Sequence, residues 1–262
     1  MRSRGGLLAA FAVFLLGAGA VRAQTMLDQE QRLIEIHSLL IALQPGGPPG
    51  AYAPGELSLG VEIIAIPTID GTTGGKRQIT ASDRTPVFPR PRLSLGLPAP
   101  QGFRASVGVA YIPPIPIRDV SSHLGAVEGA FAWAPDGPWS AGLRAYALVA
   151  QSKSPVTDPI VRDTLNTVNL GADVSAGYRL DFGSLGVTPF ASVGLTHVSG
   201  DFTVTSDNAL LTSRSTVPGF TGGVRLFARA GFEAVAELTA FPGRMVHPGF
   251  SIAWMPGWLA RR

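Results

Sequence analysis

Apolar and polar residues alternate along most of the chain, and the pattern is clearest in VNLGADVSAGYRL, residues 168–180. Val168, Val174 and Leu180 share one parity, whereas Asn169 and Asp173 fall on the other. Successive side chains of a β-strand point to opposite faces, so this alternation predicts a strand with one apolar and one polar face. The alternation alone leaves open whether the apolar face meets a protein core or lipid.

Segments of the same kind recur after Glu56, at about 57–66, 87–97, 102–112, 120–133, 138–151, 165–180, 185–198, 217–228, 231–241 and 248–256. Short turns are predicted at 98–101, 134–137, 181–184 and 229–231. They alternate with longer loops at 67–86, 113–119, 152–164 and 199–216, and with a brief one at 242–247. Long loops at one rim and short periplasmic turns at the other are typical of transmembrane β-barrels.

The composition supports a membrane barrel. Apolar residues make up 45% of the chain and charged residues only 15%, against about 25% charged in an average soluble domain. Beyond the N-terminal region, no stretch reaches the roughly 18 apolar residues of a transmembrane helix. The sequence therefore predicts an all-β fold, an antiparallel transmembrane barrel of about ten strands over residues 56–256, with eight to twelve strands as the range.

The charged residues of the predicted strands fall opposite the apolar parity of their own strands. These residues, the candidate lumen charge network, are Glu62, Arg90, Arg92, Arg104, Glu128, Arg144, Asp173, Arg179, Arg225, Glu233 and Glu237. Arginines and acids nearly balance, so we expect a largely occluded and nearly neutral lumen. A soluble periplasmic lipocalin-like barrel, the alternative, would place charges outside and carry many lysines. The chain has only Lys76 and Lys153, both in predicted loops.

Aromatic residues gather near the predicted short turns, where they would form a girdle at one membrane interface. They are Phe103, Trp133, Trp139, Tyr178, Phe182 and Phe232.

The N-terminus carries an export signal. Arg2 and Arg4 precede an apolar run, and Val21 and Ala23 form a small-residue cleavage site, so residues 1–23 are a predicted signal peptide; an uncleaved anchor is the alternative. Its removal would take away three arginines and no acid, so the formal charge of +3 would become zero. A neutral mature chain without a basic stripe gives no support to nucleic-acid binding.

Residues 24–55 are expected to form a periplasmic amphipathic helix over 26–43 and a Pro/Gly linker over 44–55. Leu33, Ile36, Leu40 and Leu43 form its apolar stripe. The helix is interpreted either as packed on the barrel rim or as plugging the pore or binding a periplasmic partner. The other expected partners are outer-membrane lipid and, during biogenesis, the barrel-assembly machinery. Residues 257–262 form a short C-terminal tail.

Candidate chemistry is sparse, and we predict no catalytic residue, cofactor or metal site. Residues 70–77, DGTTGGKR, depart from a phosphate-binding loop because Asp70 replaces its first glycine and Arg77 its final hydroxyl residue. The four histidines, His37, His123, His197 and His247, show no metal-ligand spacing, and the chain has no cysteine.

Residues 56–256 resemble the small bacterial outer-membrane β-barrel proteins in their leader, alternating strands, long external loops and short turns. The chain departs from the usual ending because it does not finish on an aromatic residue. The resemblance implies a structural, interaction or narrow-channel role. The enzyme alternative is a lipid A deacylase-like hydrolase, in which His197 would activate Ser199 with Asp201 nearby.

Overall fold

The computed structural model describes residues 26–50, 52–65, 87–117, 120–154, 162–206, 208–228 and 230–256. Its elements are α2 (Met26–Leu40), β1 (Leu57–Ala65), β2 (Val87–Leu97), β3 (Phe103–Ile117), β4 (Val120–Trp133), β5 (Trp139–Ser154), β6 (Asp163–Tyr178), β7 (Leu180–Phe182), β8 (Leu185–Val204), β9 (Ala209–Ala228), β10 (Phe232–Phe241) and β11 (Met245–Trp254).

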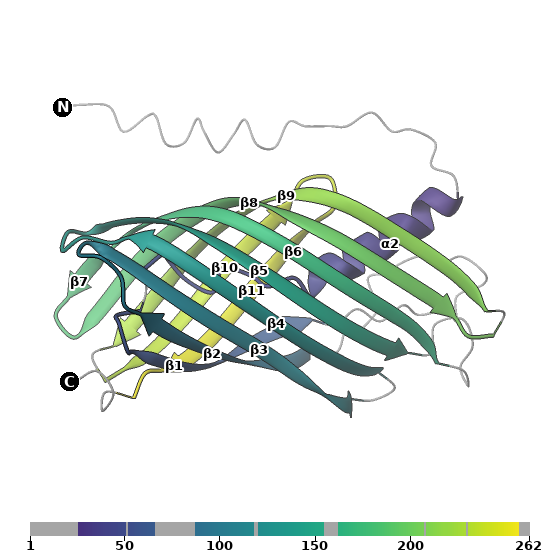
Figure 1. The fold of residues 1–262 in the computed structure, drawn as a ribbon, viewed down its shortest axis with the longest axis horizontal. Coiled ribbons are helices and arrows are strands. Elements are labelled where there is room, and N and C mark those ends of the chain that lie inside the picture. The colour runs from purple at the N-terminus through teal and green to yellow at the C-terminus, as the bar shows by residue number, and fades with distance from the viewer. Residues whose placement is uncertain are drawn as a thin grey trace.

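The strands close into a barrel. Consecutive strands pair antiparallel, and β1 pairs with β11 to join the two ends of the sheet. The short β7 continues β6 beyond Arg179, and both strands lie along β8. Because β7 continues β6, the labelled strands β1–β11 form a closed antiparallel barrel of ten strands (Figure 1). This confirms the predicted fold and strand number.

The apolar parity of the strands faces outward. On β5 and β6, Trp139, Leu143 and Val174 are more than half exposed, whereas Arg144 and Asp173 are opposite each other on the inner face and under a tenth exposed. A register slip of one residue would reverse every side chain, so the two-faced sequence fixes the register. An apolar exterior around a charged interior is the arrangement of a transmembrane barrel and the reverse of a lipocalin-like one.

Several strands are longer than the alternation predicted. The expected loop at 199–216 is instead the upper part of β8 and β9, which pair as far as Val204 and Ala209. Phe202, Val204 and Leu211 continue the alternation and pack on Ile34 of α2, which explains why this stretch is a strand rather than a loop. The strands β3 and β5 likewise extend into predicted loops, so Lys153 lies in β5. Residues 66–86, which include the whole of the first predicted loop, lie outside the described residues.

The structure places α2 inside the barrel, against β6, β8 and β9 (Figure 1), which agrees with the pore-plugging interpretation and not with a helix packed on the rim. Near its N-terminal end, Arg32 donates to the carbonyl oxygen of Gly243 in the β10–β11 turn, across an Nη2–O distance of 2.7 Å. That turn belongs to the rim opposite the short turns, which we call the far rim. The chain then runs down the lumen, and at the short-turn rim the N–H of Gly55 donates to the carbonyl oxygen of Gly96 while the N–H of Gly96 donates to that of Glu56. Residues 26–50, the inserted segment, therefore enter at the far rim and run through the barrel rather than below it.

The face of α2 that packs on the wall also differs from the predicted stripe. Leu33, Ile36 and Leu40 are half-buried, whereas Ser38 and Leu39 are fully buried. Ser38 Oγ lies 3.4 Å from Thr167 Oγ1, and Asn169 donates to the carbonyl oxygen of Ser38 at 2.8 Å. The inner face of a membrane barrel is polar, so a partly polar helix face fits against it better than the aliphatic stripe does.

We predict that arginine is costly on the outer face only within the lipid belt. Val174→Arg should lower the free energy of unfolding in lipid vesicles by about 2–4 kcal/mol, because it places a charge near the bilayer midplane. The matched control is Leu210→Arg, at an equally exposed outward position near the tip of the β8–β9 hairpin. Urea titration should show little change for that control; equal losses in both variants would contradict a lipid-facing belt.

The path of the inserted segment predicts which of its ends is accessible from outside the cell. Gln31 on α2 and Pro54 in the linker are both exposed, but they lie toward opposite rims. In intact cells a membrane-impermeant thiol reagent should label a Gln31→Cys variant and leave a Pro54→Cys variant unlabelled until the outer membrane is opened. The reverse pattern would restore the periplasmic location of the helix.

Candidate functional site

The candidate site is the charged interior where the inserted segment meets the wall. Glu62 and Arg90 are directly opposite on β1 and β2, and Arg90 Nε donates to Glu62 Oε2 at 3.0 Å. Both side chains are almost completely buried. A second chain of pairs crosses β2, β4, β5 and β6, since Arg92 and Arg144 share Glu128 and Arg144 also bonds Asp173. On the other wall, Arg225 Nε donates to Glu233 at 2.7 Å.

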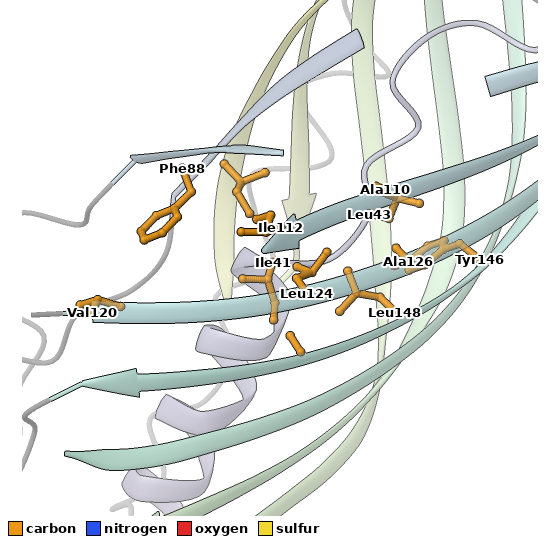
Figure 2. Packing of buried hydrophobic residues seen from close by; sticks show 12 residues of the cluster. Ile41, Leu43, Phe88, Ala110, Ile112, Val120, Leu124, Ala126, Tyr146 and Leu148 are labelled. Atoms are coloured by element: carbon orange, nitrogen blue, oxygen red, sulfur yellow. The ribbon is translucent and has the colours of Figure 1, made fainter. Parts of the chain in front are cut away.

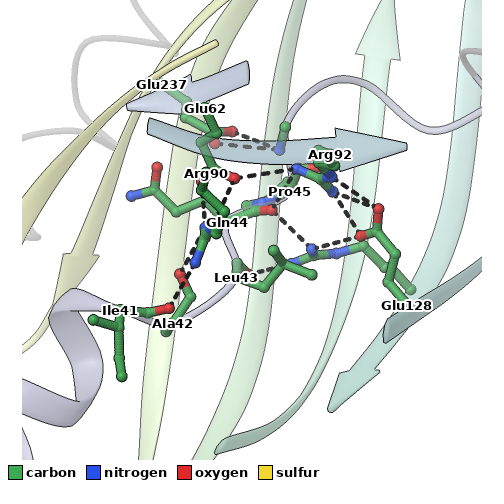
Figure 3. A network of polar contacts seen from close by, with 12 residues as sticks. Ile41, Ala42, Leu43, Gln44, Pro45, Glu62, Arg90, Arg92, Glu128 and Glu237 are labelled. Carbon is green, nitrogen blue, oxygen red and sulfur yellow. Dashed lines mark hydrogen bonds and ion pairs between the residues drawn. The ribbon is translucent and has the colours of Figure 1, made fainter. Parts of the chain in front are cut away.

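Three of these arginines also hold the backbone of the inserted segment (Figure 3). Arg90 donates to the carbonyl oxygens of Ile41 at 2.8 Å and Ala42 at 3.4 Å. Arg144 donates to those of Leu43 at 3.0 Å and Gln44 at 2.8 Å.

Arg92 completes the series. Its guanidinium donates to the carbonyl oxygens of Gln44 and Pro45, at 3.4 Å and 3.2 Å. Five consecutive carbonyl groups, from residue 41 to residue 45, therefore accept hydrogen bonds from arginines whose other edge bonds a wall carboxylate. We call Arg90, Arg92 and Arg144 the arginine clamp.

Acceptors on the opposite wall hold the amide side of the same stretch. The backbone N–H of Gly46 donates to both carboxylate oxygens of Glu237, at 3.2 Å and 3.1 Å. Gln44 donates through Nε2 to the carbonyl oxygen of His247 at 3.2 Å. The segment is thus bonded from both sides of the lumen, by the clamp on β2 and β5 and by groups on β10 and β11.

Aliphatic side chains of the segment enter an apolar patch of the wall. Ile41 and Leu43 belong to one buried cluster with Phe88, Leu124 and Leu148 of β2, β4 and β5 (Figure 2). Ile41 lies in the turn that follows α2, and the irregular stretch after it brings Leu43 into the same cluster. The wall therefore contacts the backbone through arginines and alternate side chains through this cluster.

Little open space remains around the segment. The cavities that flank residues 42–50 have volumes of about 20, 30 and 50 Å³. A single ordered water needs roughly 10–15 Å³, so these spaces hold a few waters and no larger solute. Over the described residues the lumen is filled at the level of the clamp.

Two residues of the predicted network take no part in the ion pairs of the lumen. Arg179 lies outside the lumen, contrary to the prediction, at the short-turn rim between β6 and β7. It pairs there with Asp181, and both side chains are more than half exposed. Its strand ends at Tyr178, so the inward parity carries it past the end of the lumen. Arg104 is half-buried and makes no ion pair with any described residue.

Most of the predicted girdle residues are exposed on the outer face near the short-turn rim: Phe103, Trp133, Trp139, Phe182 and Phe232. Tyr178 is half-buried and meets Trp139 edge to face at a ring-centroid distance of 4.7 Å. Contact of this girdle with a membrane interface stays a prediction.

The residues of the hydrolase alternative share the outward face of β8 but form no catalytic arrangement. His197 Nδ1 lies 3.0 Å from Thr216 Oγ1 on β9. Within the described part of the chain, Ser199 has no hydrogen bond to His197 and Asp201 Oδ1 has no partner. Nothing in this geometry activates Ser199 as a nucleophile.

The contribution of residues 41–46 was missed at the sequence level, because their backbone, not their side chains, contacts the charged wall. The sequence holds one signal that could have shown it. A run rich in Pro and Gly, such as QPGGPPG at 44–50, makes no helix or sheet of its own, so its carbonyl groups need other partners if they are buried.

Comparisons with known proteins return folds but no family. No family model and no curated protein matches the chain. Among solved structures, the chain is similar to the beta domain of the Bordetella autotransporter BrkA, with a TM-score of 0.40, 12% identity and coverage of 77% of this chain and 98% of that one. It is similar to LpxR from Salmonella typhimurium with a TM-score of 0.35, 10% identity and coverage of 75% and 99%.

A third similar structure is the siderophore receptor PiuA from Acinetobacter baumannii, with a TM-score of 0.33, 11% identity and coverage of 82% of this chain and 34% of that one.

Among the described residues, no helix has the length and hydropathy needed to cross a membrane. The closed antiparallel sheet, its apolar exterior and its charged interior define the fold as a transmembrane β-barrel.

We predict that removing one acid of the network destabilises the barrel strongly. Glu62→Gln leaves Arg90, which is fully buried, without its counter-charge and should cost about 3–5 kcal/mol of unfolding free energy in urea. The matched control is Asp181→Asn at the exposed pair with Arg179, which should cost less than about 1 kcal/mol. Equal effects would show that the inner pair is as hydrated as the outer one.

Proposed function

We propose that this protein is a closed outer-membrane barrel whose lumen is sealed by its own N-terminal segment. In the sealed state its role is structural or an interaction role, and it acts as a narrow channel when the segment is displaced. Export by a cleaved signal peptide is part of the same proposal; residues 1–23 lie outside the described residues.

The observation that carries the proposal is the set of arginine bonds to five consecutive carbonyl groups, residues 41–45. Hydrogen bonds to charged donors contribute about 1.5–3 kcal/mol each when their geometry is good. Several such bonds favour an inserted segment that stays in place at rest. The small flanking cavities support a barrel that passes no solute in this state.

Both ends of the inserted segment are also attached to the barrel. At the far rim, Arg244 Nε lies 2.6 Å from Glu35 Oε2, and Ser215 donates to the other oxygen of Glu35. At the short-turn rim, the segment continues covalently into β1. Displacement therefore requires the clamp and the Glu35 contacts to break together, which supports a closed state as the dominant one.

Loosening the segment should raise conductance. Gly46 has a φ of +67°, and a Cβ there would overlap Nη1 of Arg92. A non-glycine residue in this left-handed conformation costs about 1–2 kcal/mol, so Gly46→Ala should raise the population of the displaced state about 5- to 30-fold. In planar bilayers the wild type should be closed nearly all the time, and the variant should open correspondingly more often.

A disulfide control separates movement of the segment from leakage through the wall. The chain has no cysteine, and Ser38 and Thr167 face each other across α2 and β6. When Ser38→Cys and Thr167→Cys are added to the Gly46→Ala variant, oxidation should abolish the openings and reduction should restore them. Openings that persist after oxidation, or a wild type with steady conductance, would refute sealing by the segment.

A further inference from the structure

The arginine clamp binds main-chain carbonyl groups, which every polypeptide has. Arg90, Arg92 and Arg144 bond only carbonyl oxygens of the inserted segment and none of its side chains. The opposite wall likewise accepts a backbone N–H through Glu237. Recognition through main-chain groups is independent of sequence, whereas pockets for alternate side chains supply specificity.

The wall also supplies such a pocket. Ile41 and Leu43 insert into the apolar cluster formed with Phe88, Leu124 and Leu148. The polar residues of the segment avoid this patch, since Gln44 turns toward His247 on β11. Two side-chain positions of one parity are therefore selected for aliphatic residues.

The stretch after the pocket is selected for small residues. Gly46 lies against the guanidinium of Arg92, and Pro48 and Pro49 contact positions 177 and 142 closely enough that a Cβ at either glycine would crowd them. Each clamp arginine is already paired with a wall carboxylate, so a carboxylate at positions 41–45 of an occupant would find no free clamp arginine.

We infer that the lumen at the level of the clamp is a binding channel for an uncharged stretch of polypeptide outside helix and strand, with aliphatic side chains at two alternate positions and Pro/Gly residues behind them. Residues 41–50 of the inserted segment are its resident occupant, and a separate peptide that carries a stretch of the same chemistry binds there when the resident leaves. The inference rests on the proposed function in treating residues 26–50 as an occupant that can be separated from the wall.

The test converts the resident into a free ligand without changing the clamp. A protease recognition sequence is inserted between Pro54 and Gly55, which are exposed at the short-turn rim. Such loop sites tolerate insertion well. After cleavage of the folded protein, the N-terminal fragment should remain bound through size-exclusion chromatography. A fluorescent peptide of residues 26–50 should then exchange with it and raise the fluorescence anisotropy.

A composition-matched peptide tests specificity. In this control Ile41 is exchanged with Ala42 and Leu43 with Gln44, so that every carbonyl group is kept and only the parity of the aliphatic residues changes. We expect it to bind about tenfold more weakly or worse, because both aliphatic side chains lose their apolar pocket. Equal binding of the two peptides would overturn the inference, as would loss of the fragment immediately after cleavage.

The disulfide between Ser38→Cys and Thr167→Cys shows whether exchange takes place in the lumen. In the oxidised cleaved protein the fragment is tethered to β6, so the labelled peptide should not bind, and reduction should restore binding. Binding that ignores the disulfide would locate the peptide elsewhere and overturn the inference.

Conductance keeps the two proposals separate. If the fragment exchanges but the emptied barrel stays closed, sealing by the segment fails and the binding channel stands. If the emptied barrel conducts but discriminates against neither peptide, the binding channel fails and sealing stands.

Discussion

A guanidinium can be buried inside this barrel only when its N–H groups all find acceptors, and this requirement joins the wall to the inserted segment. Each clamp arginine bonds a carboxylate with one edge and carbonyl oxygens of residues 41–45 with the other. The need is mutual, because residues 41–45 follow the end of α2 and have buried carbonyl groups that no helix or strand satisfies. Wall and segment therefore complete each other's hydrogen bonds, and removing either leaves buried polar groups unpaired.

The number of strands explains why the lumen needs an occupant. At about eight strands the interior is just wide enough for side chains to fill, and wider barrels enclose a ligand or a channel. Ten strands leave room for a single chain without regular structure at the level of the clamp and for a helix at the far rim. At the far rim the wall extends along the helix on one side, since β8 and β9 have 20 residues each whereas β10 and β11 have 10 each. The added length carries Phe202, Val204 and Leu211, which cover Ile34 of the helix.

The sequence predicted the wall far better than its contents. Period-two alternation is a local property, so Val174 outside and Asp173 inside follow from the chain itself, as do the cross-strand pairs of Glu62 with Arg90 and Arg144 with Asp173 once the hairpins are drawn. The position of residues 26–50 is not local. Its helix has a half-buried aliphatic stripe at Leu33 and Ile36, which resembles that of a rim helix, and its contacts at 41–46 are made by backbone groups that every residue carries. Arg179 shows the complementary error, where a correct parity extends beyond the end of the lumen.

A clamp built on carbonyl groups also determines where the inserted segment can vary. The arginine bonds to Ala42 and Gln44 are made to backbone atoms and therefore do not depend directly on the identity of these two buried side chains. Gly46 differs, since its left-handed φ and its contact with Arg92 couple the turn of the chain to the pairing of Arg92 with Glu128. The clamp therefore holds this stretch mainly through its backbone and depends less on the identity of its side chains. The barrel thereby keeps the stretch that follows α2 in register at two apolar positions and one glycine.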